Sequence, residues 1–334
     1  MTLLRGVGSQ TAASNDAAVR FLPHRVDVLL AGKRLLIETG DASLLPPLFV
    51  SFGGDDERDE PPFFHAIIED AMLRVALNGN GAAPRDLFFG LDLPGCPFRA
   101  SGSTITFADD GTPQFTIEGD AVRIHDTPRW RLAVSSMLIR AFLHSIDDVV
   151  FLHAAAAGIE SKGILFVGNQ NAGKSTIALA LAAHGANFLS DEFGCYDPKR
   201  HELVPYRRPV GIRQGPKAAA IARALSANRT KFIEADDSLR VNLADLIPLS
   251  PQRRLPLHAV VFIDGFAEKP AIRFVDPGRS EVGMLQTLYS SLSNAPAVQR
   301  TFELVRLLSR SRVAYLRLGD PDETALFLQE EFGS

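Results

Sequence analysis

Hydrophobic and polar residues alternate over short stretches in the first part of the chain, and this spacing predicts strands. The apolar-rich runs 25–30 and 34–37 are separated by Ala31-Gly32-Lys33, a turn signal, so we expect a β-hairpin there. A meander is expected over residues 104–125, where alternating runs are separated by short turns rich in Asp and Gly. This part of the chain is therefore predicted to be β-rich.

Two segments of the same region have the spacing of helices instead. Residues 61–75 open with two prolines and then repeat apolar residues on one helical face, which predicts a helix. Thr127-Pro128 has the residue types of an N-cap followed by a first-turn proline, so a second helix is predicted from there to about Ser145. Together with the strands, these segments predict an α+β region.

From about residue 149 onward, runs with strand spacing alternate with runs with helix spacing. This alternation is typical of an α/β domain. A glycine-rich turn follows one of the strands, and Gly185 ends the next helix as a C′ glycine. Strands are predicted over 149–152, 163–167, 187–189, 193–196, 202–205, 258–263 and 312–318, and helices over 174–184, 218–225, 280–292, 295–309 and 321–332.

Composition and charge exclude several classes of protein. The 334 residues are 46% hydrophobic and 22% charged, which excludes a disordered chain, a coiled coil and a fibrous repeat. The net charge of −4 gives no basic field for a polyanion, so we expect no nucleic-acid partner. No run is long and apolar enough for a membrane span or a signal peptide. The two cysteines form no C-x-x-C pair, so a reduced, cytoplasmic protein is expected.

One loop indicates the chemistry. The octapeptide Gly168-Asn169-Gln170-Asn171-Ala172-Gly173-Lys174-Ser175 matches G-x-x-x-x-G-K-[ST] in full, between an apolar strand and a helix. Backbone N–H groups of such a loop and the N-terminus of the helix bind phosphate oxygens. We expect Lys174 to reach the outer phosphates and Ser175 to offer its hydroxyl to Mg²⁺. The expected nucleotide-binding residues are Gly168, Asn169, Gln170, Asn171, Ala172, Gly173, Lys174, Ser175 and Thr176.

The loop predicts a nucleotide but not a reaction, which requires a further acidic group to bind the metal or accept a proton. Asp191 and Glu192 follow the predicted strand 187–189, and Asp264 ends the apolar strand 258–263. An acidic residue is common at the end of a buried strand. For Asp264 alone, a loop residue is therefore at least as good an interpretation as a metal ligand.

Residues 151–192, FLHAAAAGIESKGILFVGNQNAGKSTIALALAAHGANFLSDE, resemble the kinase domain of HPr kinase/phosphorylase and of the HPr-kinase-related proteins. The resemblance is carried by His153 before the loop, by the G-x-x-x-x-G-K-S loop itself, by Gly185 after the helix and by the acidic pair that follows. The run 207–212, RRPVGI, resembles the family's arginine-then-G-I stretch. The resemblance covers about residues 149–213 and does not extend to residues 1–148.

The resemblance implies a P-loop kinase fold of the phosphoenolpyruvate carboxykinase/HPr kinase type. Glu192 stands at the position of the family's catalytic base, which accepts the proton of a serine hydroxyl. Asp191 would hold the metal or its waters together with Ser175. His153 stands at the position of an active-site residue that touches the acidic pair or the phosphate.

Two departures from the family bear on the substrate. Tyr206 stands where the family has a metal-binding glutamate, and Glu192 stands where it has an aspartate. Both count against HPr as the acceptor and against the reverse phosphorolysis. A tyrosine in place of the glutamate would also make the rim of the site more apolar, which suits an extended peptide. An arginine must still neutralise the transferring phosphoryl group, with Arg208 preferred over Arg213, Arg240 and Arg279.

The sequence therefore predicts a β-rich α+β domain over 1–148 that binds substrate or a partner, and an ATP-binding P-loop domain over 149–334. The predicted function is ATP- and Mg²⁺-dependent transfer of the γ-phosphoryl group to a serine or threonine hydroxyl of a protein or peptide. A nucleotide-binding regulatory module with little turnover and a small-molecule kinase stay open as alternatives, and so does a homo-oligomer.

Overall fold

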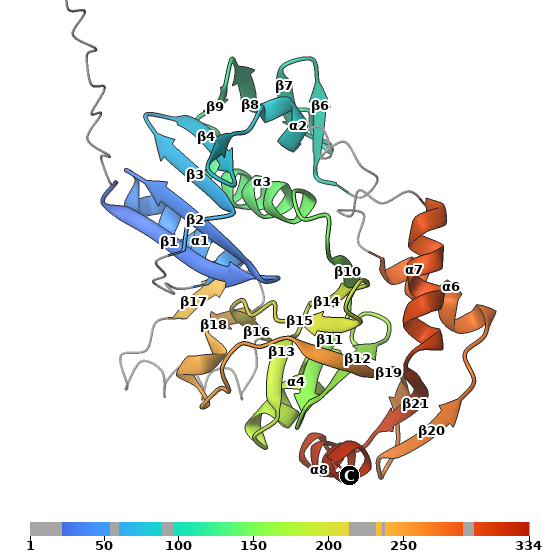
Figure 1. Cartoon of the computed structure of the whole chain (residues 1–334). Helices are drawn as coiled ribbons and strands as arrows, with labels where there is room; N and C mark the ends of the chain where they lie inside the picture. Colours follow the sequence, from blue (N-terminus) through green and yellow to red (C-terminus); the bar gives the residue numbers. More distant parts are fainter. Residues whose placement is uncertain are drawn as a thin grey trace, which may run out of the picture.

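The computed structural model describes residues 22–53, 60–88, 96–213, 232–235, 238–289 and 297–333. Within these ranges the chain forms a mixed α/β structure with two nine-stranded sheets and one three-stranded sheet (Figure 1). The predicted mixture of helices and strands is confirmed. None of the helices in the described ranges is long and apolar enough to span a membrane.

The N-terminal sheet has the strand order β1-β2-β3-β4-β9-β8-β7-β6, with β5 paired to β4. The predicted hairpin is present, because β1 (His24–Leu30) pairs antiparallel with β2 (Lys33–Thr39) around Ala31-Gly32. Both turn residues have positive φ, 51° and 72°, as the two-residue hairpin turns require. The predicted meander is also present. The remaining strands of this part are β5 (Asn80–Gly81), β6 (Phe98–Ser101), β7 (Thr104–Phe107), β8 (Pro113–Glu118) and β9 (Ala121–Ile124).

The helix predicted over 61–75 is wrong, because this segment forms β3 (Phe64–Glu69) and β4 (Met72–Leu77). Alternate residues of β3 are fully buried, which is the period of a strand. Asp70-Ala71 forms the turn between the two strands, with positive φ at both residues. β3 also pairs parallel with β2. This long-range pairing, which local spacing does not reveal, decides in favour of the strand.

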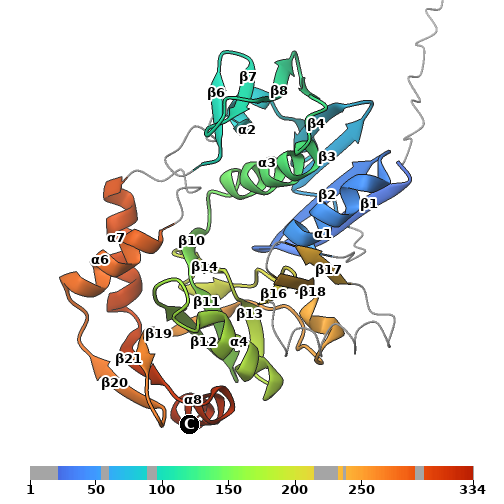
Figure 2. The ribbon, with the colours of Figure 1, turned by 180° about the vertical axis from the view of Figure 1, so that it is seen from behind.

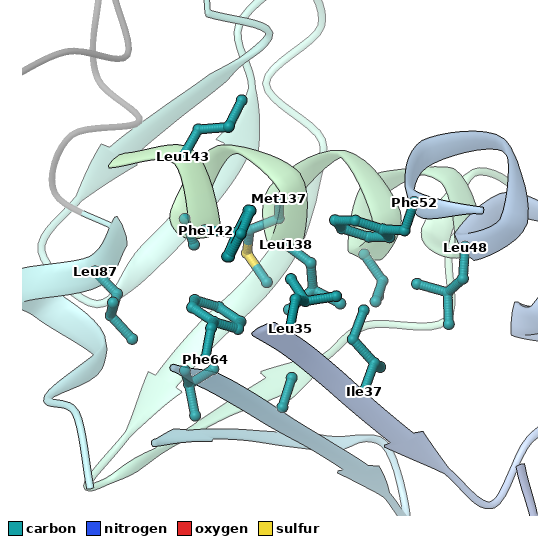
Figure 3. Packing of buried hydrophobic residues seen from close by; sticks show 14 of the residues in the cluster. Leu35, Ile37, Leu48, Phe52, Phe64, Leu87, Met137, Leu138, Phe142 and Leu143 are labelled. Atoms are coloured by element: carbon teal, nitrogen blue, oxygen red, sulfur yellow. The ribbon is translucent and has the colours of Figure 1, made fainter. Parts of the chain in front are cut away.

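Helices cover one face of the N-terminal sheet and bury its apolar residues. Figure 3 shows Leu35 and Phe64 of the sheet facing Leu138 and Phe142 of α3 (Trp130–His144). The rings of Phe64 and Phe142 meet edge to face, with centroids 5.7 Å apart. The helix predicted after Thr127-Pro128 is confirmed, although it begins at Trp130. The other helices of this region are η1 (Ala42–Leu44), α1 (Leu45–Phe52) and α2 (Pro84–Phe88).

The C-terminal sheet has the order β10-β14-β15-β19-β12-β11-β13, with β21 beside β19 and β20 beside β21. Helices cover both of its faces (Figure 1). Ile164 and Phe166 of β12 pack with α4 and α8, whereas Leu165 and Val167 face the core built with α6 and α7. The elements are β10 (Val150–His153), β11 (Ala155–Ile159), β12 (Lys162–Val167), α4 (Lys174–Ala183), β13 (Asn187–Ser190), β14 (Phe193–Asp197), β15 (Glu202–Val204), β19 (Leu255–Phe266), β20 (Ala271–Val275), α6 (Arg279–Leu288), α7 (Ala297–Ser309), β21 (Arg312–Leu318) and α8 (Pro321–Gly333).

Most elements predicted after residue 149 are present, with ends shifted by a few residues. The helix predicted over 218–225 lies outside the described residues. The alanine-rich strand β11, the edge strand β20 and the third sheet carry no clear periodicity and were not predicted. The third sheet has the order β16-β18-β17, and its elements are β16 (Val210–Arg213), β17 (Phe232–Ala235) and β18 (Ser238–Val241), followed by η3 (Leu243–Asp245).

The two large sheets share a hydrophobic core. α3 leads into β10 at the edge of the second sheet (Figure 2). The cluster beneath the first sheet continues into Phe151, Cys195 and Tyr206 of the C-terminal region. A backbone hydrogen bond from the Ala31 N–H to the carbonyl of Pro205, 3.0 Å long, adds to this contact. The end of the C-terminal sheet that holds β10 and β14 is therefore packed against the N-terminal region.

Candidate functional site

The loop 168–173 joins the carboxyl end of β12 to the first turn of α4. Gly173 is the N-cap of α4 and has φ of +99°, a conformation that only glycine adopts without strain. A Cβ on Gly173 would also lie 2.5 Å from Cδ1 of Leu318. Asn169, Gln170, Asn171 and Thr176 are exposed around this turn, and Gly168 is buried beneath it. The loop therefore packs closely against Leu318 of β21 at Gly173, and it is exposed to solvent at residues 169–171.

Lys174 lies across this loop. Its side chain is only 6% exposed, and its Nζ donates hydrogen bonds to the carbonyls of Gly168 at 2.9 Å and Asn169 at 3.0 Å. Burial lowers the pKa of Lys174, because desolvation disfavours the ammonium. Its amine is thus held near the N-terminus of α4 by the carbonyl oxygens of Gly168 and Asn169.

The turn after β13 lies next to this helix. The hydroxyl of Ser175 donates to the backbone carbonyl of Asp191 at 3.2 Å. The fully buried Ser190 accepts from the N–H of Glu192 at 3.3 Å and of Phe193 at 3.1 Å, which fixes the turn. The sequence reasoning missed Ser190, although a serine followed by Asp-Glu is a signal for such a side-chain-capped turn. The two carboxylates predicted for the site are therefore anchored beside Ser175.

Two arginines lie near the acidic pair Asp191 and Glu192. Arg208 forms an ion pair with Glu192, and its side chain is 13% exposed. The neighbouring Arg207 holds this segment against β13, donating to the carbonyl of Phe188 at 2.6 Å and to Oδ1 of Asn187 at 2.6 Å. Arg208 is thereby placed at the predicted site, as preferred from the sequence.

Arg240 of β18 is the second arginine of this group. It pairs with Gly211 of β16, and a Cβ on Gly211 would lie 3.0 Å from its Nη1. Burial raises the pKa of Asp191, while the charges of Arg208 and Arg240 oppose that rise. Burial lowers the pKa of Arg208 to about 10. The buried Nε atoms of both arginines find no hydrogen-bond partner among the described residues, so each has donor capacity left for a ligand.

His153 ends β10 opposite Phe193 of β14. The residue is exposed as a whole, but burial of part of the imidazole is the first cause that lowers its pKa, and the charge of Lys174 is the second. The imidazole therefore belongs to the same electrostatic environment as the loop lysine. Both causes favour the neutral imidazole over the imidazolium.

The other candidate residues make no direct contact with the acidic pair. Asp264 is exposed near the end of β19 and follows Ile263, whose Cβ would lie 3.4 Å from a Cβ on Gly168, so Asp264 lies near the loop. Within the described ranges, no hydrogen bond or ion pair links Asp264, or Arg279 at the start of α6, to Asp191 or Glu192. Arg213 ends β16, and the surroundings of its side chain lie outside the described residues.

The resemblance to the kinase family predicts Tyr206 at the rim of the candidate site, but the structure places it elsewhere. It is fully buried against Phe193 with ring centroids 5.4 Å apart, because it belongs to the core shared by the two sheets. Burial raises its pKa well above the ordinary value. The argument for an apolar rim is therefore wrong.

The donor set is compatible with nucleotide and Mg²⁺. Among the described residues, no three His, Cys, Asp or Glu side chains are grouped closely enough to hold a metal ion by themselves. Mg²⁺ at a nucleotide is held by one or two protein oxygens together with phosphate oxygens and water. Ser175 and Asp191 can supply those protein oxygens, and the two arginines and Lys174 can neutralise phosphate charge.

Two hollows in the N-terminal sheet lie away from the loop. The first, of about 580 Å³, is lined by Trp130 and Arg131 and by the carboxylates of Asp41, Glu69, Asp70 and Asp126. The second, of about 570 Å³, adjoins His65 and Arg74. The phosphate loop thus lies at the C-terminal sheet, whereas both hollows lie at the N-terminal sheet.

Comparison with known proteins gives little similarity. No protein-family model matches the chain, and no curated protein matches it. Among solved structures, the Hpr(Ser) kinase/phosphatase from Coxiella burnetii is similar at 14% sequence identity, with a TM-score of 0.28. The match covers 54% of this chain and 91% of that chain. A TM-score this low carries no argument about the present chain.

Proposed function

We propose that this chain binds ATP with Mg²⁺ at residues 168–176 and transfers the γ-phosphoryl group to a serine or threonine hydroxyl of a protein or peptide. One observation carries the proposal. The loop places buried Lys174 at the N-terminus of α4, and Ser175 is hydrogen-bonded to the turn that presents Asp191 and Glu192. Loop, cation, hydroxyl and carboxylates are thereby joined in one group, as phosphoryl transfer requires.

Binding relies on the backbone and on three cations. N–H groups of the loop and the N-terminus of α4 provide fixed positive potential for the phosphates. Lys174 exchanges its two carbonyl partners for phosphate oxygens, which are stronger acceptors for an ammonium. Arg208 and Arg240 bring guanidinium groups with unused Nε donors. Ser175 and Asp191 would hold Mg²⁺ together with the phosphates, and the bound ion would supply neutralisation of charge on the phosphoryl oxygens.

Transfer uses the acidic pair. The acceptor oxygen attacks the γ-phosphorus, the bond to the β–γ bridging oxygen breaks, and ADP leaves. The proton of the acceptor hydroxyl passes to the carboxylate of Glu192, because a hydroxyl near its ordinary pKa is a weak nucleophile. Arg208, which is paired with Glu192, is the arginine proposed to neutralise the transferring group. His153 lies within reach of the charge of Lys174, which favours its neutral form.

The acceptor or a partner is proposed to bind at an N-terminal domain over 1–148, beside a P-loop domain over 149–334. The hollow of about 580 Å³ supports this, since its lining has four carboxylates and one arginine, and this excess of negative charge suits a segment that carries positive charge. Cys96 and Cys195 are free and buried, which suits a reducing compartment. We therefore place the protein in the cytoplasm.

The Arg208–Glu192 ion pair also favours a second candidate function. While the pair persists, the carboxylate that would accept a proton is occupied. A nucleotide-binding regulatory module would need the loop but no free base. This candidate predicts ATP binding with little turnover.

Titration calorimetry with ATP·Mg²⁺ tests the proposed site. Lys174→Ala removes the pre-aligned cation, and we expect a loss on the order of a hundredfold in ATP affinity or transfer. Lys199→Ala, at an exposed lysine in the turn between β14 and β15, is the matched control and keeps wild-type binding. Equal affinity and equal turnover in the Lys174 variant would refute the site.

Incubation with labelled ATP and a cell lysate then separates the two functions. Label transferred to protein supports the kinase. Binding without transfer supports the regulatory module, and transfer to a small molecule would contradict both.

A further inference from the structure

Phe266 is an exposed aromatic residue beside the phosphate loop. It ends β19 and is 65% exposed. A Cβ on Gly173 would lie 3.9 Å from both Cε1 and Cζ of the Phe266 ring. An accessible aromatic ring therefore adjoins the residue at which α4 begins.

A β-bulge turns this ring toward the loop. In the pairing of β19 with β21, Ile263 is opposite Leu316 and Phe266 is opposite Leu318. Two residues of β19 therefore lie between these pairs, but only one residue of β21 does. The extra residue lies at the turn through Gly265, which has φ of +88°. Ile263, Leu316 and Leu318 all belong to the core built with α4. Without the bulge, Phe266 would point to the opposite face of the sheet, because side chains alternate along a strand.

The strand order places Phe266 and the acidic pair on opposite sides of the loop. β19 lies directly beside β12 on one side, and β11 and then β13 lie on the other. β12 runs parallel to β19 and, through two antiparallel pairings, also parallel to β13, so their carboxyl ends share one edge. A nucleotide whose γ-phosphate faces Asp191 and Glu192 then extends its ribose and base toward Phe266.

We infer that Phe266 stacks on the nucleotide base and makes this site prefer a nucleotide to a bare polyphosphate. The inference rests on the proposed function and adds the base-binding residue to it. Stacking against an aromatic ring tolerates any base, because every base has a π-face. The bulge sets the backbone register at Phe266, so the side chain leaves the strand on the face that carries the loop.

Calorimetry with two probes tests the inference: ATP·Mg²⁺ and inorganic triphosphate with Mg²⁺. In Phe266→Ala we expect about tenfold weaker ATP binding with unchanged triphosphate binding, as loss of one base–aromatic stack implies. Phe266→Trp retains ATP affinity, and its added fluorescence is quenched by ATP but not by triphosphate. Phe302→Ala is the matched control, a phenylalanine of α7 that is 71% exposed, and it leaves both affinities unchanged.

The possible results distinguish a failure of the proposed role of Phe266 from a failure of the proposed function. Wild-type protein that binds neither probe refutes the proposed function and the inference with it. Normal ATP binding by Phe266→Ala, or an equal loss for both probes, overturns the role of Phe266 and leaves the phosphate site intact. Thermal unfolding of each variant verifies that the fold is retained.

Discussion

Arg208 and Glu192 form an ion pair at the turn that follows β13, and the guanidinium of Arg208 also acts on Asp191. One largely buried cation therefore interacts with two carboxylates. Because the side chain of Arg208 is only 13% exposed, removing it leaves negative charge in a poorly solvated place. This relationship makes Arg208 the most informative position of the candidate site.

We expect Arg208→Gln to abolish transfer and to raise the pKa of Asp191 further. The charge of Arg208 opposes the rise that burial causes, so its loss stabilises the protonated carboxyl. Transfer falls by about a thousandfold, the scale of an arginine that neutralises a transferring phosphoryl group. Turnover assays and carboxyl NMR titration measure the two effects. Arg279→Gln, at the exposed start of α6, should change neither. A fully active Arg208→Gln would contradict the assignment.

We expect Glu192→Gln to bind ATP normally and to fail at transfer. The amide keeps the shape of the side chain but cannot accept the proton of the acceptor. Asp191→Asn should instead raise the Mg²⁺ concentration needed for half-maximal activity. Asp264→Asn is the matched change at the other strand end and should leave turnover unchanged. If Asp264→Asn abolishes turnover while Glu192→Gln is harmless, the wrong carboxylate has been chosen.

We expect His153 to titrate below its ordinary pKa in the free protein. Desolvation is the larger cause and the charge of Lys174 the smaller. Lys174→Met should therefore raise the His153 pKa and still leave it below about 6.5. Histidine NMR titration of both proteins checks this, with Lys199→Met as the control.

The lowered pKa of His153 also determines how the stability of the fold changes with pH. A histidine whose folded pKa is lowered binds more protons when unfolded, so it destabilises the fold as the pH falls through about 6.5. His153→Asn should reduce the difference in unfolding free energy between pH 7.5 and 5.5, as urea titrations measure. A larger difference in this variant would contradict the lowered pKa.

Two buried tyrosines should respond to the loss of their hydroxyls in opposite directions. Among the described residues the hydroxyl of Tyr206 has no hydrogen-bond partner, whereas that of Tyr196 is 2.9 Å from Nδ1 of His201. Tyr206→Phe should leave the free energy of unfolding unchanged or raise it by about 1 kcal/mol, and Tyr196→Phe should lower it by about 1 kcal/mol. Urea unfolding measures both. Strong destabilisation by Tyr206→Phe would show that its hydroxyl has a partner.

The loop and its flanking elements are local features, and the sequence predicted them well. The loop backbone takes a positive φ at Gly173, which glycine adopts without strain, and Gly185 follows the end of the helix that begins at Lys174. Arg208 is the arginine that the sequence analysis prefers among four candidates, and in the structure it forms an ion pair with Glu192. Motif and neighbouring residues suffice for such features.

The errors concern long-range packing. The segment 61–75 has both strand and helix spacing in part, and only its pairing with β2 decides between them. Tyr206 was placed at the rim by counting positions, but burial depends on the N-terminal sheet that packs over it. The bulge that turns Phe266 depends on its register with β21, some fifty residues away in the sequence. None of these relationships is encoded by local periodicity.

The hydrophobic core shared by the two sheets has a consequence for how the chain opens. Phe151, Cys195 and Tyr206 are covered by the N-terminal region, so a fragment starting near residue 149 would expose them to water. The amides of β10 and β14 should therefore exchange with solvent together with those of β1 and β2, as one cooperative unit. The turn that carries the acidic pair lies on this unit, so any force that loosens the N-terminal sheet also loosens the position of Asp191 and Glu192.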